Sequence, residues 1–201
     1  MKKFCVVSLI LAAAVAAQAS LVPNGDFQTI YKPGEPTNTA TLEDGEYFSI
    51  TDQAMKGSGE ATYSDGSTGT GIELPGWTTV LGGADAMQGG TWGGPEGSGD
   101  IALMCFAGWG GPTVVETAAS LSIPALNAGE VLELSADIYN HGGPVVLELL
   151  VDGVVVAPDT ESTPALISGE WVKYSETYSS IPAGDVTVLV GTRDDAGTGW
   201  T

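Results

Sequence analysis

Short segments in which apolar and polar residues alternate run through the second half of the chain. In the clearest of them, residues 130–140, one face carries only apolar side chains, namely Leu132, Leu134, Ala136 and Ile138. A period of two residues is typical of a half-buried β-strand. The same reasoning predicts further strands at residues 101–106, 113–123, 145–152, 154–157, 171–179 and 185–192. Because Asp152-Gly153 favours a tight hairpin and no amphipathic helical pattern appears after residue 19, we predict an all-β fold, an antiparallel β-sandwich.

The first half of the chain is less regular. We predict an opening strand at residues 21–28 (LVPNGDFQ). A second strand is expected within residues 74–80, where it follows the turn at Pro75-Gly76. Glycine, serine, threonine and acidic residues dominate the rest, which predicts long loops at residues 29–74 and 82–99. The first loop is expected to contain one short strand near residues 46–51. Its segment 57–71 carries too few apolar residues to be expected to pack.

The first nineteen residues have the pattern of a secretory signal peptide. Two lysines follow Met1, an apolar run covers residues 4–17, and Ala17-Gln18-Ala19 is a typical cleavage sequence. We therefore predict cleavage after Ala19 and a secreted, extracellular or cell-surface protein. The apolar run is shorter than the roughly 20 residues of a membrane span, and no second run follows, so we expect no transmembrane segment. Residues 20–201 are expected to form a single β-sandwich domain.

Acidic residues far outnumber basic ones. The chain has 25 acids and 6 bases, and loss of Lys2 and Lys3 with the signal peptide changes the net charge from −19 to −21. Such a charge repels phosphate backbones, which excludes nucleic acid as a partner. Cys105 is the one cysteine after the signal peptide and lies in an apolar run, so we expect a buried thiol, with an intermolecular disulfide as the alternative.

The residue patterns of common catalytic sites are missing from the sequence. His141 is the single histidine, so a zinc site of several histidines is excluded, and no G-x-S-x-G motif accompanies it. Neighbouring acids such as Asp194-Asp195 are expected by chance in a chain with this many carboxylates. We therefore predict a protein that is not an enzyme, with His141 in an exposed turn and contact with a ligand as the alternative role.

Several short motifs occur in an order that resembles one class of secreted module. These motifs are NGDFQ at 24–28, PGW at 75–77, GDIAL at 99–103, LELSAD at 132–137 and WVKY at 171–174. Together they resemble the galactose-binding-like jelly rolls, in particular carbohydrate-binding modules of the families four, nine and twenty-two type. The resemblance covers nearly all of residues 20–201 and implies a jelly roll. It also implies that the last strand is missing, because the chain stops at Thr201, where another strand would begin.

The resemblance also suggests a metal and a ligand. Modules of this type commonly open with Phe-Glu and hold a structural calcium ion. Here Gln28 replaces the glutamate, which leaves Asn24, Asp26 and Gln28 as candidate calcium ligands.

Tryptophans in glycine-rich settings are the candidate sugar-binding residues. Trp92 and Trp109 lie in GTWGG and AGWGG, where either loop packing or sugar stacking explains an aromatic side chain. The polar groups of such a site are expected from the strand at 130–140, and they are Asp137, Tyr139 and Asn140. Trp77 and Trp171 lie in predicted strands and are expected in the core.

Three functions follow from these patterns. The first is a secreted, non-catalytic module that binds carbohydrate, a polysaccharide or a cell-surface glycan. The second is a structural or adhesive cell-surface protein in which the sandwich is a display domain. The third, a hydrolase, rests only on the abundance of carboxylates and is placed last.

Overall fold

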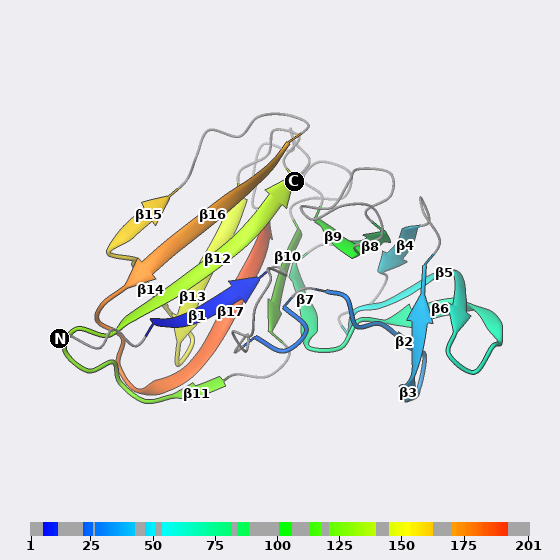
Figure 1. Cartoon of the computed structure of the whole chain (residues 1–201), viewed down its shortest axis with the longest axis horizontal. Coiled ribbons are helices and arrows are strands. Elements are labelled where there is room, and N and C mark those ends of the chain that lie inside the picture. Colours follow the sequence, from blue (N-terminus) through cyan, green and yellow to red (C-terminus); the bar gives the residue numbers. More distant parts are fainter. Residues whose placement is uncertain are drawn as a thin grey trace.

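The computed structural model describes residues 6–11, 22–25, 27–42, 47–50, 54–81, 84–88, 101–105, 113–117, 121–139, 145–162 and 170–192 (Figure 1). These residues form three β-sheets, and no helix occurs among them. The prediction of an all-β protein built from antiparallel strands is therefore confirmed. Within the same ranges, no helix is long and apolar enough to cross a membrane.

The first sheet has four strands in the order β1-β12-β16-β15. They are β1 (Val6–Leu11), β12 (Val131–Tyr139), β16 (Trp171–Tyr178) and β15 (Thr160–Ser162). β12, β16 and β15 pair antiparallel, whereas β1 pairs parallel with β12. β1 lies within the predicted signal peptide, so cleavage after Ala19 would remove it and leave β12 at the edge of this sheet.

The second sheet has the order β14-β13-β17-β10-β7, with β11 also paired to β17. Its strands are β14 (Val154–Val156), β13 (Val145–Val151), β17 (Gly184–Thr192), β10 (Thr113–Thr117), β7 (Trp77–Leu81) and β11 (Leu121–Ile123). The expected hairpin is present, since Val151 is the partner of Val154 across a two-residue turn. Asp152 and Gly153 have φ of 49° and 77°, the left-handed values that this turn requires.

The third sheet has seven strands in the order β3-β2-β6-β5-β4-β8-β9. They are β3 (Glu35–Thr41), β2 (Tyr31–Lys32), β6 (Thr68–Glu73), β5 (Lys56–Tyr63), β4 (Tyr47–Ile50), β8 (Ala84–Gln88) and β9 (Ile101–Cys105). Five of these strands lie in the range 29–74, for which the sequence predicted a long loop with a single short strand. That expectation was wrong about this range. Within 82–99, the other predicted loop, the structure describes only β8.

A tyrosine explains how the glycine-rich hairpin β5–β6 packs. Tyr63 is buried, its ring lies so close to Gly69 that a Cβ there would approach ring atoms to 2.9 Å, and its hydroxyl donates to the carbonyl oxygen of Gly71 at 3.0 Å. The aromatic ring therefore covers glycines that have no side chains of their own. Counting apolar residues underestimated this segment because one large ring supplies much of its buried surface.

The main core lies between the first two sheets. Leu132, Leu134 and Ala136 of β12 are buried, and together with Tyr178 of β16 they belong to one cluster with residues of β13 and β17, namely Leu147, Leu149, Val151, Val186 and Val188. Figure 1 shows β12 and β16 lying in front of β13 and β17. A buried Leu or Val side chain stabilises the fold by about 1.5–3 kcal/mol, so this cluster holds the two sheets together. The face of β12 and β16 that points away from it is the outer face.

Candidate functional site

The structure describes only some of the residues that the sequence proposed for a site. Asp137 and Tyr139 lie on β12, and Asn24 and Gln28 lie near the start of the expected mature chain. The other candidates, Trp92, Trp109, Asn140 and Asp26, lie outside the described residues, as does His141. Cys105 is the last residue of β9, and only its backbone is described.

The described residues of the opening segment, 22–25 and 27–28, form turns and not the strand that the sequence predicted at 21–28. The amide of Gly25 donates to the carbonyl of Val22 at 3.2 Å. The amide of Phe27 donates to the carbonyl of Asn24 at 3.0 Å. Asn24 and Phe27 have φ of 49° and 58°, which a strand does not allow. Asn tolerates this left-handed conformation better than most residues, so the Asn-Gly pair produces a turn at this point.

Asn24 joins this turn to the Pro75-Gly76-Trp77 motif. Its amide nitrogen donates to the carbonyls of Thr29 and Pro75, both at 2.9 Å, and its Oδ1 accepts from the amide of Thr29 at 2.9 Å. The carbonyl of Asn24 accepts from the indole of Trp77 at 3.0 Å, and the ring centroids of Phe27 and Trp77 lie 5.0 Å apart. The opening turn and the Pro75-Gly76-Trp77 motif, which lie far apart in sequence, are therefore held together by these contacts. We call this set of contacts around Asn24 the joint.

These contacts change the expected calcium site. The side chain of Asn24 donates two hydrogen bonds and its Oδ1 accepts one, so one lone pair of Oδ1 is left for a metal ion. A calcium ion held here would need most of its oxygens from other groups, and Asp26, another of the expected ligands, lies outside the described residues. Among the described residues, no group of three or more His, Cys, Asp or Glu side chains is arranged to hold a metal ion.

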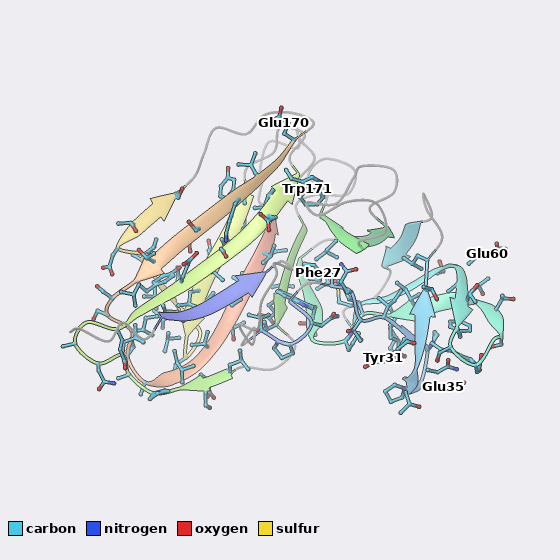
Figure 2. All side chains as sticks on the ribbon, viewed as in Figure 1. Phe27, Tyr31, Glu35, Glu60, Glu170 and Trp171 are labelled. Carbon is cyan, nitrogen blue, oxygen red and sulfur yellow. The ribbon has the colours of Figure 1, made fainter. Side chains whose placement is uncertain are left out.

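Asp137, by contrast, lies on the outer face of β12 beside residues of β16. The antiparallel register pairs Asp137 with Lys173 and Tyr139 with Trp171. Because residues two apart on a strand share a face, all four positions belong to one end of the outer face. Figure 2 shows Trp171 at this end, next to Glu170.

The carboxylate of Asp137 lies near the charge of Lys173, its partner across the strands, but has no hydrogen bond to a described residue. It is partly buried, and within the described chain it accepts no hydrogen bond and makes no ion pair. Burial raises the pKa of Asp137, and the charge of Lys173 opposes this rise only in part. A carboxylate that is only partly buried keeps free acceptor positions, so it is suited to accept hydrogen bonds from water or from a ligand.

Ser135, the next outer-face residue along β12, shows the same lack of partners. The residue is 0% exposed, and its Oγ has no hydrogen-bond partner among the described residues. This burial belongs to the chain that still carries β1; without β1 the hydroxyl would lie at the edge of the sheet, where water or a ligand could bond to it. The register places Ser175 of β16 on one side of Ser135 and Ile10 of β1 on the other.

Trp171 is the site residue that the sequence analysis assigned to the wrong place. It was expected in the core, but it is only partly buried and lies on the same face as Lys173, whereas Tyr178 of the same strand faces the core. The alternation along residues 171–178 carried this information, because Trp171 and Tyr178 are seven positions apart and so fall on opposite faces. Trp77, also expected in the core, is 1% exposed, which confirms that prediction.

No family model, curated protein or solved structure matches the chain.

Proposed function

We propose that the protein is an exported, non-catalytic carbohydrate-binding module with a galactose-binding-like jelly-roll fold. Its glycan lies on the outer face of β12 and β16, over the end that carries Trp171, Tyr139, Asp137 and Lys173. The observation that supports this most is the position of Trp171, a partly buried indole on the same face as the carboxylate of Asp137, to which no described residue donates a hydrogen bond.

The chemistry of these groups suits a sugar. The apolar face of a pyranose ring packs on a flat aromatic side chain, while carboxylates and ammonium groups bind the hydroxyls around its edge. Asn140 comes next in the sequence after β12 and remains a proposed polar contact of the glycan, although it lies outside the described residues. We assign Trp92 and Trp109 to the same glycan as further stacking residues, as the sequence suggested.

Binding to immobilised polysaccharides tests this proposal. Trp171→Ala is expected to weaken binding about tenfold, because a stacking contact contributes on the order of 1 kcal/mol beyond its buried area. Trp171→Phe keeps an aromatic face and is expected to retain most of the affinity. Urea unfolding of both variants controls for stability.

Two results would count against the proposal. If Trp171→Ala binds as tightly as the unchanged protein, the site lies elsewhere. If no polysaccharide or glycan binds the unchanged protein, carbohydrate binding is wrong, and a structural or adhesive display protein becomes the better account.

A further inference from the structure

The distribution of charge around the outer face bears on the kind of glycan that fits it. Of the six basic residues, Lys32 pairs with Glu35 and with Asp65 in the turn between β5 and β6, and Lys56 pairs with Glu73, all in the region of the third sheet. Lys2 and Lys3 belong to the predicted signal peptide, and Arg193 lies outside the described residues. Lys173 is therefore the one base that the described structure places on the outer face.

Acidic groups surround that lysine. Asp137 is its cross-strand partner, Glu133 lies further along the same face of β12, and the exposed Glu170 precedes Trp171. This end of the face thus carries more negative than positive charge, on a chain whose net charge is −19. A glycan that carries carboxylate or sulfate groups would be repelled.

Two polar groups of β12 are available to a ligand on this face. Within the described part of the chain, no residue donates a hydrogen bond to the carboxylate of Asp137, and the Oγ of Ser135, two residues away on the same face, has no partner. Cleavage of the signal peptide would take away β1, which pairs with β12 next to Ser135, and so open this edge. A protonated amine supplies three donors and one positive charge, and it is also attracted to the face of an indole such as that of Trp171.

From this charge distribution and these unpaired groups we infer that the glycan bears primary amines, as in a polymer of glucosamine. The inference rests on the proposed glycan site and narrows its ligand. An ammonium group of the sugar pairs with Asp137, the ring stacks on Trp171, and Lys173 repels the amine and so limits the affinity.

The test measures binding of the exported protein to oligomers of glucosamine, N-acetylglucosamine and galacturonic acid, at a slightly acidic pH at which the amines are protonated. We expect the glucosamine oligomer to bind best. The N-acetylated oligomer should bind about tenfold more weakly, because it cannot form the charge-assisted hydrogen bond. The uronic acid oligomer should not bind, because its carboxylates are repelled by the acidic face. Added salt is expected to weaken only the first interaction.

Two substitutions of opposite sign sharpen the test. Asp137→Asn is expected to weaken glucosamine binding about tenfold, whereas Lys173→Gln is expected to strengthen it about two- to threefold by removing a repulsive charge. Glu60→Gln is the matched control for net charge, because Glu60 is exposed on β5 and lies well away from Trp171 (Figure 2). It should change the affinity little.

The outcomes separate this inference from the proposed function. Equal binding of the glucosamine and N-acetylglucosamine oligomers, or loss of binding in Lys173→Gln, would overturn the amine preference while leaving carbohydrate binding intact. Failure of every oligomer and polysaccharide to bind would overturn both.

Discussion

Replacing Asn24 should destabilise the protein more than any other single change on its surface turns. Its side chain makes three hydrogen bonds of 2.9 Å, with the carbonyl of Thr29, the carbonyl of Pro75 and the amide of Thr29. At about 1 kcal/mol for each bond, Asn24→Ala loses roughly 3 kcal/mol. An alanine at a φ of 49° costs about 1 kcal/mol more. The expected loss of about 4 kcal/mol is a large share of a typical stability of 5–15 kcal/mol.

Two further variants separate the contributions at this position. Asn24→Gly loses the same hydrogen bonds but adopts the left-handed conformation freely, so it should be about 1 kcal/mol less destabilising than Asn24→Ala. Asn24→Asp keeps the acceptor for Thr29 but puts carboxylate oxygens against two carbonyls, so it should also destabilise. Urea unfolding followed by far-UV circular dichroism gives the free energies of unfolding. If Asn24→Ala unfolds within 1 kcal/mol of the unchanged protein, the joint does not contribute as we argue.

Three further predictions concern the outer face and the ends of the domain. Burial raises the pKa of Asp137, so the ionised carboxylate lowers the free energy of unfolding near neutral pH. Asp137→Asn should therefore be more stable than the unchanged protein at neutral pH. Urea unfolding should show this difference in free energy shrinking as the pH falls towards about 4, where the carboxyl group becomes protonated. N-terminal sequencing of the exported protein should begin at Ser20, and that chain should unfold cooperatively because β12 keeps β16 and its core contacts without β1. The double variant Trp92→Ala, Trp109→Ala should bind glycan more weakly in a pulldown; unchanged binding would remove both from the site.

The sequence predicted the second half of the fold well because side-chain alternation there is regular. Leu132, Leu134 and Ala136 are buried as expected, and β12 spans Val131–Tyr139 within the predicted 130–140. The hairpin at Asp152-Gly153 was also predictable, because its positive φ values suit these two residue types. Both predictions depend on local chemistry that a short window of sequence contains.

The first half was harder because its packing depends on contacts between distant residues. The ring of Tyr63 covers Gly69, and Asn24 bonds to the carbonyl of Pro75, a residue 51 positions away. Neither contact leaves a periodic pattern in the sequence. The sequence therefore predicted loops where glycine-rich strands occur, and a strand where the opening segment forms turns. The NGDFQ and PGW motifs were nevertheless the residues that meet.

The candidate site was only partly predictable for a similar reason. Alternation identified Asp137 as an outward residue of its strand, but only the register with β16 shows that Lys173 and Trp171 lie beside Asp137 and Tyr139. Pairing register is a property of two strands together and cannot be obtained from either strand alone. The sequence alone therefore identified Asp137 but not its neighbours on β16.

The position of the bound glycan is the central claim, and nuclear magnetic resonance titration tests it most directly. The exported, isotope-labelled protein is titrated with the oligomer of glucosamine while the amide and indole signals are followed. We predict the largest shifts at the indole of Trp171 and at the amides of Asp137 and Lys173, with little change at Glu60. Shifts confined to residues away from β12 and β16, or no shifts at all with any glycan, would contradict the account.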